Sequence, residues 1–74
     1  METIILTIDG MKCGMCEAHI NNIIRKNFDV KKVKSSHKKN TCMIKSNNTL
    51  DKSLIKSLIE KEGYKVLDIK TENQ

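Results

Sequence analysis

The feature that most constrains the fold is a hydrophobic period that switches from strand-like to helix-like twice along the chain. Residues 3–9, "TIILTID", place Ile4, Leu6 and Ile8 on one face, which is typical of a strand with one buried side. Gly10 ends this run. From Cys16 the apolar residues recur at helical spacing, with Glu17 in the first turn, where the helix dipole favours an acidic side chain. The first third of the chain therefore predicts a strand followed by a helix.

Two shorter strands are expected next. Residues 29–35, "DVKKVKS", form a weak strand pattern because only two of the seven are apolar, and Ser35 continues the inward face poorly. The polar residues 37–40, "HKKN", predict a hairpin turn. Residues 41–46, "TCMIKS", return as a strand with Cys42 and Ile44 facing inward and Met43 on the opposite, open face.

The second switch of period completes the pattern. Residues 50–63, "LDKSLIKSLIEKEG", carry an apolar stripe at helical spacing, with Asp51 as the expected N-cap and Gly63 as the C-terminal stop. Residues 64–70, "YKVLDIK", predict the last strand. Residues 71–74, "TENQ", are expected to be a frayed tail.

The resulting order is β-α-β-β-α-β over a single domain, residues 1–74. Two split βαβ units of this kind predict an α+β, ferredoxin-like sandwich, in which a four-stranded antiparallel sheet carries both helices on one face. Right-handed crossovers favour the spatial order 4-1-3-2. In this topology three connections share one end of the domain, namely residues 11–16, 37–40 and 63–64.

Size and charge narrow the function classes. A chain of 74 residues buries only about 60% of its unfolded surface and has no room for a deep active-site cleft, so we do not expect an enzyme. A net charge of +5 favours acidic partners. Nucleic acid is disfavoured because Phe28 and Tyr64 are the only aromatic side chains, too few for a base-stacking platform.

The cysteines and the N-terminal residues indicate the cellular compartment in which the protein is found. The start, "METIILTIDG", has no basic segment before its short apolar run, and no stretch approaches the roughly 18 apolar residues of a membrane helix. We therefore expect a soluble, cytoplasmic protein without membrane insertion. In a reducing cytosol a Cys-x-x-Cys pair is more often metal-binding or catalytic than a structural disulfide, and the odd count of 3 cysteines points the same way.

The two cysteines of "GMKCGMC", Cys13 and Cys16, fall between the first strand and the first helix. The helix N-terminus favours thiolates, and two thiolates at this spacing can converge on one soft metal ion such as Cu(I) or Hg(II). Zinc usually takes four ligands, and the chain has neither a second Cys-x-x-Cys nor a His-x₃₋₅-His pair. A dithiol redox protein is the rival reading, but such folds set a cis-proline opposite the dithiol and this chain has no proline.

The chain resembles the heavy-metal-associated domain family, which comprises small copper chaperones and the N-terminal modules of copper-transporting P-type ATPases. The family signature Gly-Met-x-Cys-x-x-Cys is matched by Gly10, Met11, Cys13 and Cys16, and the similarity extends from residue 3 to about residue 70. The resemblance implies that Cys13 and Cys16 hold Cu(I) and pass it to a partner by thiol exchange. It also implies that Met11 packs under the loop and that Tyr64 lies beside it.

Lys12 bears on the choice of metal. Zinc- and cadmium-handling members of the family often have an acidic residue between the Met and the first Cys, and this chain has a lysine there. A cation at this position favours an anionic bis-thiolate Cu(I) unit. The resemblance therefore implies a bacterial-type copper chaperone, with a P-type ATPase module or a mercury- or zinc-binding member as alternatives. The N- and C-termini favour a free-standing chaperone over an excised module.

Other side chains have a functional and a purely structural interpretation. His19, one helical turn after Cys16, is expected on the helix surface, with a third metal ligand as the alternative. His37 and Met15 are expected to be surface residues near the loop, and Cys42 a small buried hydrophobe. Lys12, Lys38 and Lys39 are expected to steer docking to an acidic partner domain. An exposed two-thiolate site would also permit a metal-bridged homodimer in place of a monomer.

Overall fold

Each stretch of apolar periodicity forms the type of element that its spacing predicts. The computed structural model describes residues 2–12 and 14–73. Its elements are β1 (Glu2–Asp9), α1 (Gly14–Asn27), β2 (Lys32–Ser36), β3 (Thr41–Ser46), α2 (Lys52–Lys61) and β4 (Lys65–Asn73). This βαββαβ order confirms the predicted α+β class.

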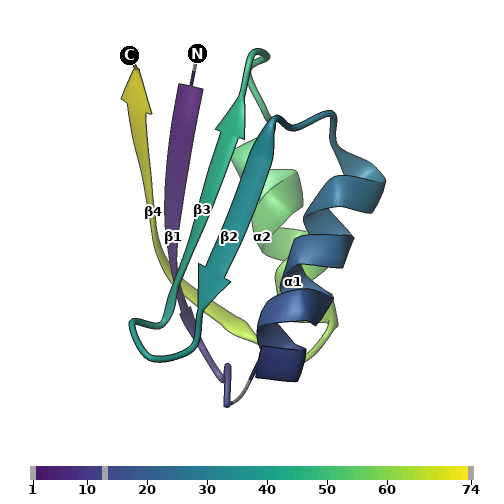
Figure 1. Ribbon diagram of the computed structural model, residues 1–74, viewed down its shortest axis with the longest axis vertical. Helices are drawn as coiled ribbons and strands as arrows, with labels where there is room; N and C mark the ends of the chain where they lie inside the picture. Colours follow the sequence, from purple (N-terminus) through teal and green to yellow (C-terminus); the bar gives the residue numbers. More distant parts are fainter. Residues whose placement is uncertain (1, 13, 74) are drawn as a thin grey trace.

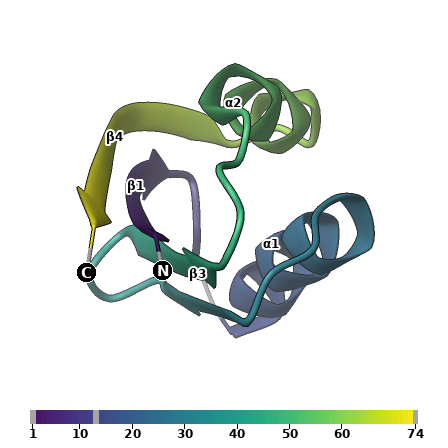
Figure 2. The same cartoon turned by 90° about the horizontal axis from the view of Figure 1, so that it is seen from above.

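The four strands form one antiparallel sheet in the order β2-β3-β1-β4. This is the predicted order 4-1-3-2 read from the opposite edge. Both helices lie on the same face of the sheet (Figures 1 and 2). In the central pair, Leu6 of β1 lies opposite Cys42 of β3 and Ile4 lies opposite Ile44, so inward-facing side chains of both strands stack on one face.

The core fills the space between the sheet and the two helices. β1 is one of the two inner strands of the sheet, and it buries Ile4, Leu6 and Ile8 completely. Each helix contributes two fully buried isoleucines at a spacing of four residues, which is the period of one helix face (Ile20 and Ile24; Ile55 and Ile59). Both ends of α2 are as predicted. At the N-terminus the Asp51 side chain accepts the Leu54 N–H at 3.1 Å. At the C-terminus Gly63 follows the helix with a φ of +99°.

The structure corrects three of the expected boundaries. α1 begins at Gly14 rather than Cys16, because its first two residues, Gly14 and Met15, are exposed and do not belong to the buried face whose spacing marks the helix. β2 is shorter than expected and starts at Lys32. The carbonyl of Asp29 instead accepts a bond from the Ser46 hydroxyl at 3.0 Å, so residues 29–31 form the connection.

The third correction concerns the C-terminus, where residues 71–74 were expected to fray. β4 continues through Asn73, and Thr71 and Glu72 pair with Ile4 and Thr3 of β1. The pairing is possible because β1 itself begins at Glu2, so a partner strand is available along the whole segment. Gln74 lies outside the described residues.

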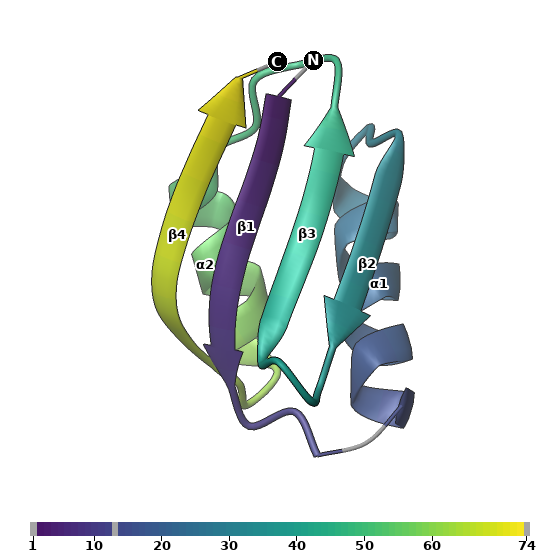
Figure 3. The ribbon, with the colours of Figure 1, turned by 60° about the vertical axis from the view of Figure 1, so that its left-hand side comes forward.

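The predicted gathering of loops at one end is also present. The connection between β1 and α1, the β2–β3 turn and the α2–β4 connection lie together at one end of the sheet, and the two termini lie at the other (Figures 1 and 3). The end that carries the three connections is called the loop end below. Residues far apart in sequence can therefore contact one another beside the cysteine motif.

Candidate metal centre

The connection after β1 is held by a glycine turn and a buried methionine. Gly10 has a φ of +105°, a conformation that L side chains rarely adopt, and a Cβ there would lie 3.5 Å from Cδ1 of Tyr64. Met11 is almost fully buried and belongs to the hydrophobic core. Its inward packing, expected from the family signature, is thus confirmed. These two residues fix the path by which the chain leaves β1 and approaches α1.

Cys16 lies in the first turn of α1, as expected, while Cys13 lies outside the described residues. The Cys16 side chain is half-buried and packs against the edge of the core. The first turn of a helix presents backbone N–H groups and the positive end of the helix dipole, both of which stabilise a thiolate. Cys16 therefore lies at a position where the helix stabilises a thiolate.

Cys42 has the opposite environment. It is fully buried in β3, as predicted, and burial raises the pKa of its thiol, while a hydrogen bond with Ser35 acts in the other direction. A neutral buried thiol packs as a small hydrophobe. Ser35, which the pattern marked as a poor inward residue, is itself buried and donates its hydroxyl to Oδ1 of Asn21 in α1 at 2.7 Å.

Glu17, the residue after Cys16, ties α1 to the β2–β3 turn. Its Oε2 accepts the backbone N–H of His37 at 2.7 Å and lies 2.5 Å from Nδ1 of the His37 ring. The His37 backbone N–H, and then its ring, hold the pKa of the Glu17 carboxyl below its ordinary value. His37 is thus at the loop end as predicted, but it is engaged by a carboxylate.

His19 ties α1 to the other side of the loop end. Its Nε2 lies 3.4 Å from Oε1 of Glu62, the C-cap residue of α2, and its Nδ1 lies 3.3 Å from the Tyr64 hydroxyl. The His19 and Tyr64 rings meet edge to face, with centroids 6.0 Å apart. His19 is a surface residue, as expected, and Tyr64 also packs against the core.

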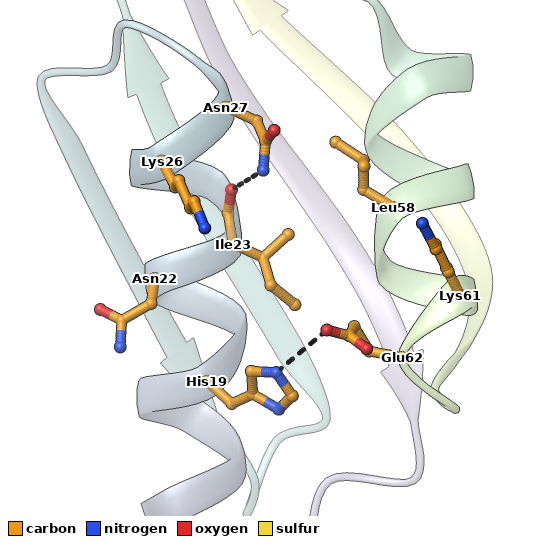
Figure 4. Close-up of a pocket in the computed structure, with 8 residues that line it drawn as sticks. All are labelled: His19, Asn22, Ile23, Lys26, Asn27, Leu58, Lys61 and Glu62. Atoms are coloured by element: carbon orange, nitrogen blue, oxygen red, sulfur yellow. Dashed lines mark hydrogen bonds and ion pairs between the residues drawn. The ribbon is translucent and has the colours of Figure 1, made fainter.

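These contacts lie at one end of a groove between α1 and α2. The groove has a volume of about 420 Å³, and its lining is mostly polar (His19, Asn22, Ile23, Lys26, Asn27, Leu58, Lys61 and Glu62). Figure 4 shows His19 reaching across the groove from α1 toward Glu62. The groove is open and shallow, so it does not resemble an enclosed substrate site.

The remaining predicted residues lie on the surface. Lys12, Lys38 and Lys39 are exposed, and Met15 is the most exposed large apolar side chain described, at 82%. Met43 alternates with the buried Cys42 and Ile44 and therefore lies on the open face of the sheet, as predicted.

The sequence did not predict that Glu17 and Glu62, both at the loop end, would be the partners of His37 and His19. Glu17 was noted only for its favourable place in the helix dipole, and Glu62 was not singled out. Glu62 immediately precedes Gly63 and Tyr64, which the topology places at the loop end, so its position beside His19 could have been inferred. No sequence signal paired Glu17 with His37, since they lie 20 residues apart.

Within residues 2–12 and 14–73 there is no group of three or more His, Cys, Asp or Glu side chains arranged to hold a metal ion. Nor is any helix in this part of the chain long and apolar enough to cross a bilayer.

Solved structures with the same fold include several metal-binding domains. The copper transporter domain Ccc2a of yeast, determined in apo and Cu(I)-loaded states, is 30% identical with a TM-score of 0.80, over 92% of this chain and 97% of that chain. CopZ metallochaperone is 23% identical with a TM-score of 0.80, over 88% and 98%. The N-terminal domain of ZntA in its Zn(II) form is 21% identical with a TM-score of 0.80, over 90% of each chain.

A comparison with curated protein sequences gave no match. Residues 5–65, which include the whole cysteine motif and both helices, match the profile of the heavy-metal-associated domain. The match spans most of the chain and agrees with the fold and with the gathering of connections around Cys16. The chain belongs to the heavy-metal-associated domain family.

Proposed function

We propose that this protein is a cytoplasmic copper carrier that binds Cu(I) through the thiolates of Cys13 and Cys16. The observation that carries the proposal is the placement of the cysteine motif. Cys16 lies in the first turn of α1, at the end of the molecule where three connections meet, and the buried Met11 anchors the connection that leads to it. Family membership and the copper-binding relative Ccc2a support the same function.

Two thiolates suit Cu(I) better than zinc. Sulfur ligands select soft ions, and Cu(I) is satisfied by two of them, whereas zinc is usually held by four ligands. Lys12 adds a positive charge beside the pair and favours an anionic complex of two thiolates with one monovalent ion. Met11, Lys12 and Tyr64 would then surround the ligands without binding the metal.

Zinc binding is the second candidate, because the domain of ZntA solved in its Zn(II) form has the same fold and the same TM-score as the copper transporter domain Ccc2a. A zinc site would need ligands beyond the two cysteines. The nearest imidazole along α1 is His19, and both of its ring nitrogens already have protein partners. Copper is therefore the better-supported cargo. A mercury-binding member and a dithiol redox protein are less well supported.

Carrier function requires that the metal can leave. In the proposed transfer, a thiolate of the partner attacks the bound Cu(I), a three-coordinate intermediate forms, and one of the two cysteines then releases the ion. The partner is a copper-transporting P-type ATPase or one of its metal-binding domains, and this chain is either a free-standing chaperone or such a module itself. The exposed Lys12, Lys38 and Lys39 would steer docking to an acidic surface, so transfer should slow as salt is raised.

The test is a comparison of cysteine variants under anaerobic conditions. Substitution of both Cys13 and Cys16 by Ser should abolish Cu(I) binding and leave the circular dichroism spectrum unchanged, since Cys16 lies at the edge of the core and not in it. Cys42→Ala is the matched control and should still bind Cu(I), because its thiol is buried in β3. Stoichiometric Cu(I) binding by the double variant would contradict the proposal.

A further inference from the structure

His19 is close in sequence to the cysteine motif, and both of its ring nitrogens have protein partners. It follows Cys16 by three residues on α1, and side chains at this spacing are neighbours on one helix face. Helical side chains also lean toward the N-terminus of their helix, which is where the cysteine motif lies. A Cys-x-x-His pair of this kind would supply one sulfur and one imidazole ligand, the ligand types that zinc accepts.

The partners of His19 come from the other side of the groove. Nε2 faces Oε1 of Glu62 at 3.4 Å, and Nδ1 faces the Tyr64 hydroxyl at 3.3 Å. One neutral tautomer satisfies both contacts, with Nε2–H donating to the carboxylate and Nδ1 accepting from the hydroxyl. In that tautomer neither nitrogen has a lone pair available for a metal. Figure 4 shows the ring directed toward α2.

We propose that Glu62, assisted by Tyr64, holds the His19 ring away from the metal and so disfavours His19 as a third ligand. Glu62 then acts as a specificity-determining residue that disfavours zinc without touching the ion. This inference rests on the proposed function, because it assumes that Cys13 and Cys16 are the ligands.

The size of the effect follows from the exposure of the pair. The side chains of His19 and Glu62 are 47% and 45% exposed, so their contact is a weak surface pair. Loss of such a pair should raise zinc affinity by up to about fivefold, the equivalent of about 1 kcal/mol. Cu(I) affinity should change less, because Cu(I) does not need a third ligand.

The direction in which zinc affinity changes in Glu62→Ala distinguishes this proposal from a purely electrostatic effect of the lost charge. Removing a carboxylate near a dication site lowers the attraction for Zn(II), so charge alone predicts weaker zinc binding by Glu62→Ala. Release of His19 predicts tighter zinc binding by the same variant. Asp9→Ala is the matched charge control, because Asp9 is an exposed carboxylate at the same end of the molecule and has no contact with His19 among those described.

The experiment measures Zn(II) and Cu(I) affinities by chelator competition for the unmodified protein and four variants. Glu62→Ala should bind zinc a few-fold more tightly, Glu62→Gln should stay near the unmodified protein because its amide oxygen still accepts from Nε2–H, and Asp9→Ala should not gain. The double variant His19→Ala/Glu62→Ala should lose the gain. X-ray absorption at the zinc edge should show an imidazole ligand in Glu62→Ala that is absent from the double variant.

Zinc affinity that is unchanged or lowered in Glu62→Ala, or a zinc-edge spectrum without an added imidazole, would overturn the inference while leaving the copper proposal intact. Failure of the proposed function has a different signature, namely Cu(I) binding that survives loss of both Cys13 and Cys16. Unfolding curves of the apo variants show whether any change in affinity comes from loss of the fold.

Discussion

The two histidines attach α1 to opposite sides of the loop end, but they do so with different strength. His37 contacts Glu17 through its backbone N–H at 2.7 Å and through its ring at 2.5 Å, with side chains 32% and 27% exposed. His19 contacts Glu62 at 3.4 Å, with both side chains close to half exposed. The contact of His37 with Glu17 is short, is made by both the backbone and the ring, and is partly shielded from water. The contact of His19 with Glu62 is long and exposed, and it is accompanied by a second long contact, of the ring with the Tyr64 hydroxyl at 3.3 Å.

This difference indicates two roles for similar residue pairs. A short contact that uses a backbone N–H fixes where the first turn of α1 lies relative to the β2–β3 turn. A long contact between exposed side chains fixes little, but it occupies the His19 ring and can be released at small cost. The loop end therefore combines a rigid attachment at Glu17 with a releasable one at His19.

The largest expected effect tests whether either pair holds α1 in place at all. Ile24 of α1 is fully buried in the hydrophobic core. Ile24→Ala should lower the free energy of unfolding by about 2–5 kcal/mol, because it removes buried methyl groups and leaves a cavity. Urea titration followed by circular dichroism measures this. A loss no larger than that of His19→Ala would mean that the polar contacts, and not the core, hold the helix.

A second prediction concerns the short pair. Glu17→Ala removes the acceptor of the His37 backbone N–H, so hydrogen exchange at that amide should become several-fold faster while exchange in the core of β1 stays slow. NMR-detected exchange reports both in one experiment. Unchanged protection at His37 would show that the turn is held by other contacts and would remove the distinction between the two pairs.

The pH dependence of the short pair has a defined sign. The pKa of Glu17 in the folded state lies below its ordinary value of 4.5, first because of the His37 backbone N–H and then because of its ring. The unfolded chain therefore takes up the proton more readily, and the contribution to stability is present above the unfolded pKa and is lost as pH falls through the folded pKa.

The apo protein should accordingly lose more stability between about pH 5 and pH 3 than the variant Glu17→Gln, which has no carboxylate to protonate. Urea unfolding across this range measures both slopes. Parallel slopes would contradict the assignment of the shift to the contact with His37.

The smallest expected effect belongs to the exposed pair. His19→Ala should lower the free energy of unfolding by less than about 1 kcal/mol, as for other surface pairs. Ala has the higher helix propensity, which offsets part of that loss. A larger loss would mean that the contact with Glu62 is a structural attachment like that of Glu17, and that it cannot be released to admit a metal.

Most of the fold could be predicted because the apolar residues recur with the period of the helix or strand that they form. The alternation in β1 and the four-residue spacing in both helices indicate one buried face each, and these faces form the core. The boundaries that were missed depend on contacts that leave no apolar trace. Thr71 and Glu72 extend β4 through backbone pairing, and the segment before Lys32 is set by the bond from Ser46 to the Asp29 carbonyl.

The cysteine motif could likewise be placed at the loop end from topology alone. The side chains around it could not, because the partners of His19 and His37 depend on which rotamers meet across 20 or more residues of sequence. His19 was expected on the surface, and it lies there. That its ring nitrogens are both engaged is information that only the structure provides, and it changes how the metal preference is explained.

The central claim is that the motif "GMKCGMC" binds copper through two thiolates, and one competition tests it most directly. The reduced protein is offered equal Cu(I) and Zn(II) anaerobically, each buffered by a calibrated chelator, and its metal content is counted after desalting. The account predicts one Cu(I) per chain, or one per two chains if the ion bridges a dimer, with zinc excluded. Preferential uptake of zinc would contradict it.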